Sequence, residues 1–255
     1  MILRRIIEHF RKQEWTAIAI DFVIVVVGVF VGLQVSNWNA ARVDRVRAHE
    51  YLQRIGADLD ADIFTYNDRL TFWAKVADYG AKGLDYAETG DAKGASQWEL
   101  LLAYFQSSQV AEFYTTQATY NELTSAGELG LIADTGLRND LAQYYSLGIN
   151  PAMAERPLYR QNVRGIIPLH VQLYIWNNCY KSDPKARQLM LDCASPVDEA
   201  EAARVVDAIR TDAALMAELR YWMSTMKVAS QVGSDRLESA TALRAAVEAA
   251  LAEAS

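Results

Sequence analysis

The sequence is poor in the residues and patterns that mark metal or catalytic chemistry. Its 255 residues include three histidines and two cysteines, none at the spacing of a zinc site such as His-x-x-x-His or Cys-x-x-Cys. It also lacks the Gly-x-Ser-x-Gly turn that carries a nucleophilic serine, and a glycine-rich loop that cradles phosphate. We therefore expect no catalytic residue, no metal and no cofactor, and the sequence favours a protein without enzymatic activity.

Proline, glycine and basic charge are also limited. Five prolines and thirteen glycines are spread along the chain, with no proline before Pro151, so no low-complexity linker and no internal repeat stand out. The net charge is −7; residues 1–36 carry four basic and three acidic residues, which leaves 21 basic and 29 acidic residues, or −8, for the rest. This balance argues against nucleic acid as a partner and against docking of the domain on an anionic membrane surface.

One long apolar run is present near the N-terminus. Residues 18–35 hold a single charged residue, Asp21, and a helix of that length crosses a hydrocarbon core of ~30 Å. Trp15 and Trp38 bracket the run, where aromatic rings favour the two membrane interfaces. A buried core helix usually keeps a polar stripe, and a signal peptide is shorter and ends at a small-residue cleavage site, so both alternatives fit less well. We predict a short basic segment over residues 1–14, a transmembrane anchor over 15–37 and a helical extracytoplasmic domain over 38–255.

Charge does not decide the orientation of this anchor. Four cations lie on each side of it, which makes the positive-inside rule a tie; they are Arg4, Arg5, Arg11 and Lys12 before the run and Arg42, Arg45, Arg47 and Arg54 after it. Long domains that follow an anchor translocate largely regardless of charge. We therefore expect an anchor in the bacterial inner membrane, with the N-terminus in the cytoplasm and the main domain in the periplasm.

One face of the anchor favours self-association. Asp21, Gly28, Gly32 and Asn39 fall within a narrow arc at 100° per residue. Gly28 and Gly32 form a Gly-x-x-x-Gly pattern, which lets two helix backbones approach closely, and a carboxylate such as Asp21 should face protein or water rather than acyl chains. The sequence therefore predicts a homo-oligomer through this face. The alternative is an ordinary glycine pair in a membrane helix, with Asp21 reaching the headgroups.

Beyond the anchor the helical pattern continues. Apolar residues recur mostly three or four positions apart, the period of a helix that buries one stripe; they are Leu52, Ile55, Leu59, Ile63, Tyr66, Leu70, Trp73, Ala77 and Leu84. We predict one unbroken helix from the anchor to about Glu88. Its stripe faces either the core of the domain, which is the interpretation we favour, or a coiled-coil partner.

The rest of the chain is also predicted to be helical. Caps, breakers and apolar spacing predict three helices in the middle of the chain: one over residues 98–110, one that ends at Ala126 with Gly127 as its cap, and one from Asp134 to a break at Asn150-Pro151. Three more follow: one over 154–178 with a kink at Pro168, one from Ser195 to about Val232, and one from Asp235 to the end. No strand is expected. The predicted fold class is all-α, with a single N-terminal transmembrane helix that continues into a long helix and is followed by an elongated helical bundle.

The two cysteines suit an exported domain. Cys179 and Cys193 are separated by a polar turn, and an even cysteine count outside the cytoplasm is typical of a disulfide. Such a bond closes a loop of about 15 residues and contributes about 3 kcal/mol in the chain-entropy model. Two free buried thiols in a cytosolic domain are the alternative.

Several polar and aromatic groups are candidate binding residues. Arg138 lies one turn into a helix, where a cation opposes the dipole, so we expect it to pair with Glu122 or Glu128, or else to bind an anion. We expect two carboxylate pairs to lie on solvated helix faces. Two clusters of aromatic side chains line either a ligand pocket or, as such clusters do more often, the core. These sets are Asp58 with Asp62, Glu199 with Glu201, Tyr104 with Phe105, Phe113, Tyr114 and Tyr120, and Tyr174 with Trp176 and Tyr180.

Two stretches carry a resemblance to a known family. Leu33-Gln34-Val35-Ser36-Asn37-Trp38-Asn39 is similar to the Leu-Gln-Val-Asn-Asn-Trp-Asn signature that ends the anchor in an uncharacterised family of bacterial single-span membrane proteins. Residues 120–145 resemble the central motif of that family through Leu123, Ser125, Gly127, Leu129, Ile132, Asp134, Leu137, Arg138, Leu141, Tyr144 and Tyr145. Ser125-Ala126-Gly127 departs from the Ser-Ser-Gly expected there. The family has no assigned activity, so the resemblance implies an anchor and a helical extracytoplasmic domain, and no reaction.

These observations lead to two hypotheses of function. The first is a membrane-anchored periplasmic helical module that binds an unknown protein partner or assembles with itself. With about 14 residues expected inside the cell, such a module passes any signal through its partner. The alternative is a ligand-binding receptor or an enzyme that uses the aromatic-rich centre. A concave pocket with convergent polar groups favours the alternative, whereas an exposed apolar stripe on the long helix favours the first.

Overall fold

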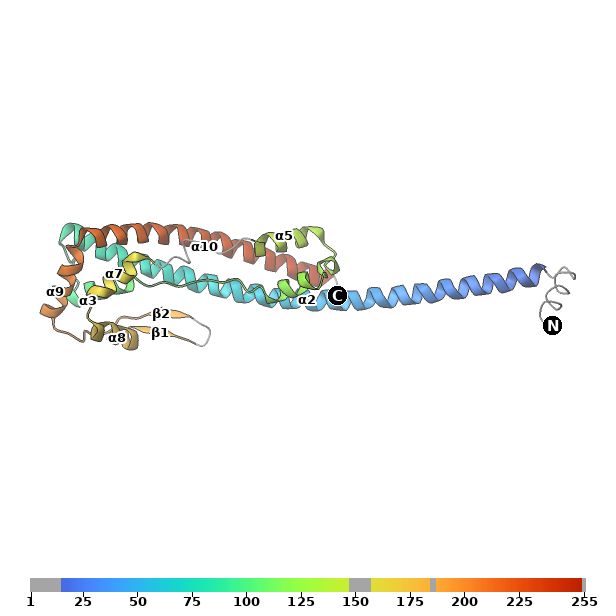
Figure 1. The fold of residues 1–255 in the computed structure, drawn as a ribbon, viewed down its shortest axis with the longest axis horizontal. Helices are drawn as coiled ribbons and strands as arrows, with labels where there is room; N and C mark the ends of the chain where they lie inside the picture. The colour runs from blue at the N-terminus through green and yellow to red at the C-terminus, as the bar shows by residue number, and fades with distance from the viewer. Residues whose placement is uncertain (1–14, 147–156, 184–186, 254–255) are drawn as a thin grey trace.

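The computed structural model describes residues 15–146, 157–183 and 187–253. Within them the chain is all-α apart from one small hairpin (Figure 1), which confirms the predicted fold class. The elements are α2 (Trp15–Thr89), α3 (Gln97–Gln106), α4 (Ala118–Ser125), the 3₁₀ turn η1 (Leu129–Leu131), α5 (Thr135–Ser146), α7 (Leu158–Ile166), α8 (Leu169–Asn178), β1 (Tyr180–Ser182), β2 (Gln188–Met190), α9 (Glu199–Arg210) and α10 (Ala213–Glu253). The basic segment 1–14, the break at Asn150-Pro151 and the predicted helix start at residue 154 lie outside the described residues.

Helix α2 is the axis of the molecule. It runs for 75 residues to Thr89, which confirms one continuous helix to about Glu88. All described side chains from residue 18 to residue 46 are exposed, and this part projects from the bundle as a lone helix, which we call the arm (residues 15–46; Figure 1). The start of the arm is long and apolar enough to cross a membrane.

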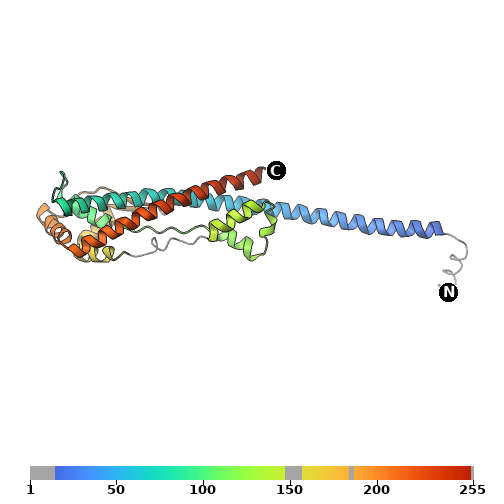
Figure 2. The same cartoon turned by 90° about the horizontal axis from the view of Figure 1, so that it is seen from above.

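The remainder of α2 packs along α10. The two helices lie side by side over the length of the bundle, and α10 ends near the point where the arm begins (Figures 1 and 2). Leu52, Ile55, Leu59, Tyr66 and Trp73 of the predicted stripe are buried. The core-facing interpretation of the stripe is therefore confirmed for these residues, because α10 and the shorter helices cover them.

The buried side chains form two cores along this axis. The proximal core, next to the arm, joins α2 and α10 to α4 and α5, with Leu123, Leu137 and Leu141 fully covered. The distal core joins them to α3, α7, α8 and α9, and includes Phe105 and Trp222. Short helices thus flank both ends of one long helix pair.

The structure corrects the predicted helices in the C-terminal third. The predicted single helix from Ser195 to Val232 is two helices, because the chain turns at Thr211–Asp212 and the Asp212 carboxylate accepts hydrogen bonds from the first N–H groups of α10. Helix α9 begins at Glu199 with Asp198 as its N-cap, whose side chain accepts from the Glu201 N–H. The hydroxyl of Ser195 donates instead to the Val197 carbonyl in a local turn.

Helix α10 continues through Gly233, where the sequence predicted an end. This glycine lies against α2, and a Cβ at its position would stand 2.8 Å from Cζ3 of Trp73 and 3.1 Å from Cδ2 of Leu70. Glycine is therefore present for close helix packing rather than for termination. At Pro168 the predicted kinked helix is instead divided into α7 and α8, since Ile167 and Pro168 both adopt extended backbone angles.

A two-stranded antiparallel hairpin, which the sequence did not predict, lies between the cysteines. Tyr180 pairs with Met190, and Cys179 and Cys193 form the predicted disulfide at its base, with Cα atoms 5.3 Å apart. The Leu191 N–H also donates to the Cys179 carbonyl, at 2.9 Å. Strands of three residues are too short to show an alternating pattern, which is why sequence reasoning missed them.

Gly233→Ala tests whether α10 depends on this close approach. Although alanine is the better helix former by up to about 1 kcal/mol, its Cβ would overlap Trp73, which is buried and held by a hydrogen bond from Nε1 to the Ala111 carbonyl. We expect a net loss of about 1–2 kcal/mol of unfolding free energy, measured by urea unfolding of the full chain in detergent. Gly165→Ala is the matched control, because no atom lies within 4 Å of its added Cβ. Equal stability of the two variants would contradict close packing at Gly233.

Candidate functional site

Three arginines line one pocket beside the distal core. Arg69 comes from α2, while Arg160 and Arg164, four residues apart, lie on the same face of α7. The pocket measures about 620 Å³ and is also lined by Val110, Glu112, Tyr114, Gln161 and Gln188. We call it the arginine pocket.

Behind the pocket lies a run of four buried polar residues, residues 106–109, which we call the polar turn. It begins with the last residue of α3, Gln106, and each of its members is 2% exposed or less. Its polar groups are satisfied inside the protein: Gln106 Nε2 donates to the Cys179 carbonyl at 3.2 Å, and the Ser107 hydroxyl lies 3.0 Å from that of Tyr159. Burial of this turn costs little because these hydrogen bonds replace those to water.

Two arginines share the acceptors of the polar turn. Arg164 donates from Nε to the Ser108 hydroxyl at 2.9 Å and from Nη2 to Gln109 Oε1 at 3.1 Å. Arg160 donates from Nη1 to the Ser108 carbonyl at 2.8 Å and to the same Gln109 oxygen at 3.4 Å. Both cations therefore converge on neutral oxygens.

Arg164 is a half-buried cation among aromatic rings. Its guanidinium carbon lies 4.5 Å from the centre of the Phe105 ring and 5.2 Å from that of Trp176. Burial, together with the charge of Arg160, lowers the pKa of Arg164 to about 9, so it still carries its charge at neutral pH. Among the described residues no carboxylate pairs with it, and such a charge is costly unless an opposite charge compensates it.

Arg69 and Glu112 are the other charged residues that line the pocket. Arg69 donates from Nε to the Glu112 carbonyl at 2.7 Å and pairs through Nη1 with Asp68, at 2.8 Å. The Glu112 carboxylate accepts a hydrogen bond from the Tyr114 hydroxyl. The lining thus holds three guanidinium groups and one carboxylate, an arrangement suited to holding an anion.

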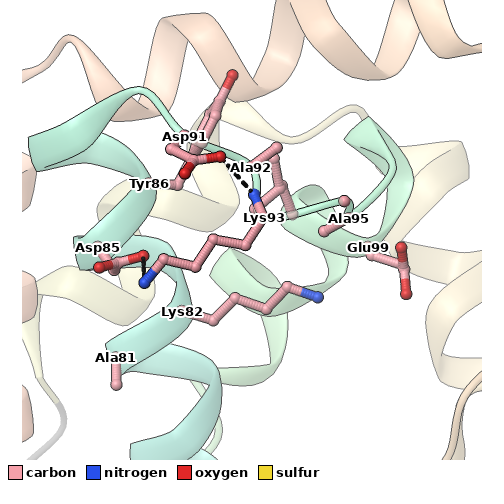
Figure 3. Close-up of a pocket in the computed structure, with 11 residues that line it drawn as sticks. Ala81, Lys82, Asp85, Tyr86, Asp91, Ala92, Lys93, Ala95 and Glu99 are labelled. Carbon is pink, nitrogen blue, oxygen red and sulfur yellow. Dashed lines mark hydrogen bonds and ion pairs between the residues drawn. The ribbon is translucent and has the colours of Figure 1, made fainter.

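A second hollow, at the far end of α2, is a structural turn. Its charged groups bind one another: Lys93 pairs with Asp85 at 2.8 Å, and the Lys93 N–H donates to Asp91 at 2.9 Å (Figure 3). Glu99 closes the capping box of α3 with Ser96, whose N–H and hydroxyl lower the pKa of the Glu99 carboxylate. These contacts hold the loop between α2 and α3.

The predicted pairing of Arg138 with Glu122 or Glu128 is wrong. Arg138 donates to the Ile132 carbonyl at 2.5 Å and to the Thr135 hydroxyl at 2.9 Å, and so binds the turn that precedes its own helix. Glu122 pairs with Arg54 and Glu128 with Arg47, both on α2. The two glutamates therefore fasten α4 and the turn after it to the base of the bundle.

The predicted association face is open in the structure. Asp21, Gly28, Gly32 and Asn39 are exposed on the arm, and a Cβ added at either glycine would meet no atom within 4 Å.

Among the described residues, no group of three or more histidine, cysteine, aspartate or glutamate side chains is placed to hold a metal ion.

Most of the singled-out aromatic side chains belong to the core. Tyr104, Phe105 and Phe113 are buried, and Tyr120 stacks on Tyr145 with ring centres 4.5 Å apart. Tyr114 differs, because it is 64% exposed and lines the arginine pocket. Sequence reasoning did not single out Arg164 or the polar turn behind the pocket. It assigned residues 106–109 to a helix over 98–110, whereas α3 ends at Gln106.

Asp62, predicted to lie on a solvated face, is buried. It is 1% exposed, and its carboxylate accepts hydrogen bonds from the Thr116 N–H at 2.8 Å and the Tyr144 hydroxyl at 2.7 Å. Asp58, one turn earlier, accepts from the Thr119 N–H at 3.3 Å. The pair fastens the start of α4 and the segment before it to α2, and burial raises the pKa of Asp62.

Asp62→Asn tests that burial through pH. The unfolded chain loses this proton near pH 4, whereas the native protein keeps it to higher pH, so between the two values the native state binds more protons and stability falls as pH rises. Asparagine does not titrate. We expect wild type to lose stability relative to Asp62→Asn as pH is raised from 4, in urea unfolding of the full chain.

Tyr144→Phe is the matched second variant. It removes a hydrogen bond that lowers the pKa of Asp62, so its stability should fall more steeply with pH than that of wild type. Parallel pH profiles for wild type, Asp62→Asn and Tyr144→Phe would show that Asp62 titrates alike in the folded and unfolded chains.

Comparisons with other proteins add no assignment to this geometry. Protein-family models, curated protein sequences and solved structures give no match to the chain. The resemblance of residues 33–39 and 120–145 to a family of single-span membrane proteins therefore stays an expectation.

Proposed function

We propose that the protein is a membrane-anchored helical module that binds or assembles rather than catalyses. The arm crosses the bacterial inner membrane, the N-terminus lies in the cytoplasm and the bundle lies in the periplasm. The observation that carries the proposal is the continuity of α2 from Trp15 to Thr89. A single helix that is both anchor and core element joins the bundle rigidly to whatever holds the arm.

The exposure of the arm supports an anchor. Its large apolar side chains from Ile20 to Val35 are about half to two-thirds exposed, and no element of the bundle covers them. In water, such an exposed apolar surface strongly favours association. In a bilayer the acyl chains solvate these side chains, and the helix keeps its own backbone hydrogen bonds. Trp15 and Trp38 lie about 35 Å apart at 1.5 Å per residue, which suits rings at two membrane interfaces.

The disulfide supports the periplasmic side. Bonds between cysteines persist in oxidising compartments and are rare in the cytosol, and Cys179–Cys193 closes the base of the hairpin in the distal half. The opposite orientation would place this bond in a reducing compartment.

The glycine face supports assembly with a second copy. From Gly28 the exposed face continues through Gly32, Val35 and Asn39 to Val46, at steps of three, four or seven residues. Val46 is 53% exposed, although it lies beyond the apolar run. Helices that meet at the glycines can stay in contact along this line until the bundle begins.

One observation favours the second candidate, a ligand-binding receptor. The arginine pocket is a concave site with convergent polar groups, and Tyr114 from the aromatic-rich centre lines it. Its charged groups are three guanidinium groups and one carboxylate, which are suited to binding. The two functions are compatible, because the pocket lies in the distal half and the association face lies on the arm.

Topology is tested by labelling thiols in intact cells. We expect Cys193, the partly exposed member of the pair, to react with a membrane-impermeant maleimide only after treatment with an impermeant reductant, without opening the inner membrane. A cysteine-free variant that carries Gln13→Cys is the control, and it should label only when the inner membrane is opened. Native thiols that label without reductant, and only in opened cells, would overturn both the disulfide and the periplasmic location.

Self-association is tested at the two glycines. Gly28→Leu and Gly32→Leu should reduce crosslinked dimer several-fold in membranes at matched expression, because the added side chains block backbone contact. Val23→Leu, on the opposite face, is the matched control and should crosslink like wild type. A peptide of residues 1–40 shows whether the anchor alone associates, since the bundle can hold copies together. A monomeric peptide, with glycine variants that crosslink like wild type, would exclude this interface.

A further inference from the structure

We propose that the arginine pocket is a binding site for a small soluble oxyanion, a carboxylate or a phosphate group carried on a molecule with an apolar part. Arg164 and Arg160 hold the negative group, and Tyr114 and Val110 contact the remainder. The proposal is independent of the association of the arm, because every residue of the pocket lies in the bundle.

The first support is an uncompensated charge. Arg164 donates to a serine hydroxyl and a glutamine carbonyl oxygen, both neutral, and within the described part of the chain its Nη1 makes no hydrogen bond. A guanidinium group satisfies a carboxylate or phosphate through two parallel N–H groups, and it binds such groups more strongly than neutral acceptors. An oxyanion in the pocket would supply the missing negative charge beside two cations.

The second support is that the cation is held in place before any ligand binds. The Phe105 and Trp176 rings flank Arg164, and these two rings meet edge to face with centres 5.7 Å apart. Gln109 Nε2 donates to Gln106 Oε1 at 3.2 Å, and Gln106 in turn donates to the carbonyl of the disulfide-bonded Cys179. Side chains that are already ordered lose little entropy on binding, which favours affinity.

The lining limits the charge of the ligand. Glu112 places one carboxylate in the pocket, held by the Tyr114 hydroxyl, and Arg69 is already paired with Asp68. A ligand with many negative charges would be repelled by Glu112, whereas one with one or two charges meets Arg164, which pairs with no carboxylate among the described residues. The volume of about 620 Å³ suits a small organic molecule.

Distance favours a soluble ligand over a lipid headgroup. Arg69 lies 31 residues beyond Trp38 on the same continuous helix, or about 46 Å at 1.5 Å per residue. The headgroups of the membrane that the arm is proposed to cross lie far below the pocket. A molecule free in solution meets no such barrier.

The experiment measures binding to the full chain in uncharged detergent by isothermal titration calorimetry. The probes are sodium benzoate and inorganic phosphate, each against sodium chloride of equal ionic strength, and vesicles of phosphatidylglycerol form a third arm. We expect saturable binding of benzoate or phosphate, weakened about tenfold or more by Arg164→Gln through loss of charge-assisted hydrogen bonds. Arg220→Gln, which removes an exposed arginine paired with Glu88, should bind like wild type.

Each outcome decides the proposal. Arg164→Gln must keep the circular dichroism of wild type; if it does not fold, Arg160→Gln replaces it, since it removes the second cation and should also weaken binding. Saturable binding lost in the pocket variant and kept in Arg220→Gln supports the site. No saturable heat up to about 10 mM of either probe, or equal loss in both variants, overturns it. If the protein binds the phosphatidylglycerol vesicles but neither benzoate nor phosphate, the proposal of a soluble ligand is overturned. None of these results depends on crosslinking of the arm, so the assembly proposal stands or fails separately.

Discussion

The close packing of α2 against α10 is the contact on which the rest of the structure depends. Each large apolar side chain buried between them contributes about 1.5–3 kcal/mol, and the contact runs through both cores. It requires small residues where the helices approach: a Cβ at Gly80 would stand 2.0 Å from Met223 Sδ, and one at Gly233 would overlap Trp73. Because the pair is long, the short helices need only cover its exposed sides.

Two buried polar clusters complete the packing, with different consequences. Asp62 receives hydrogen bonds from Thr116 and Tyr144, which ties a segment without regular structure to α2. The polar turn satisfies its own groups and also holds Arg164 beside Arg160. The first cluster balances one buried charge with hydrogen bonds. The second leaves Arg164 at a pocket with no carboxylate partner among the described residues, which is more typical of a binding site than of a structural contact.

The geometry of α2 connects the two proposals. The arm and the bundle share one helix, so a copy that pairs through the arm would be held at a defined rotation relative to its partner. The arginine pocket lies toward the far end of that helix, away from the proposed membrane. Arg164 of this pocket lies over the ring of Trp176, which packs against the distal core.

The sequence by itself determined the features that depend on neighbours along the chain. The apolar run, the three- and four-residue stripe up to Leu84 and the pairing of two lone cysteines all follow from local spacing and composition. Only the tertiary structure decided which residues are buried by segments that are distant in the sequence. Asp62 looks solvated until Tyr144, 82 residues later, binds it, and Gly233 looks like a helix end until Trp73 packs on it. Arg138 binds backbone carbonyl groups close to it in sequence, whereas Arg164 contacts aromatic rings and hydrogen-bond acceptors from other segments of the chain. Which partner each arginine binds depends on the packed fold, and the local sequence does not specify it.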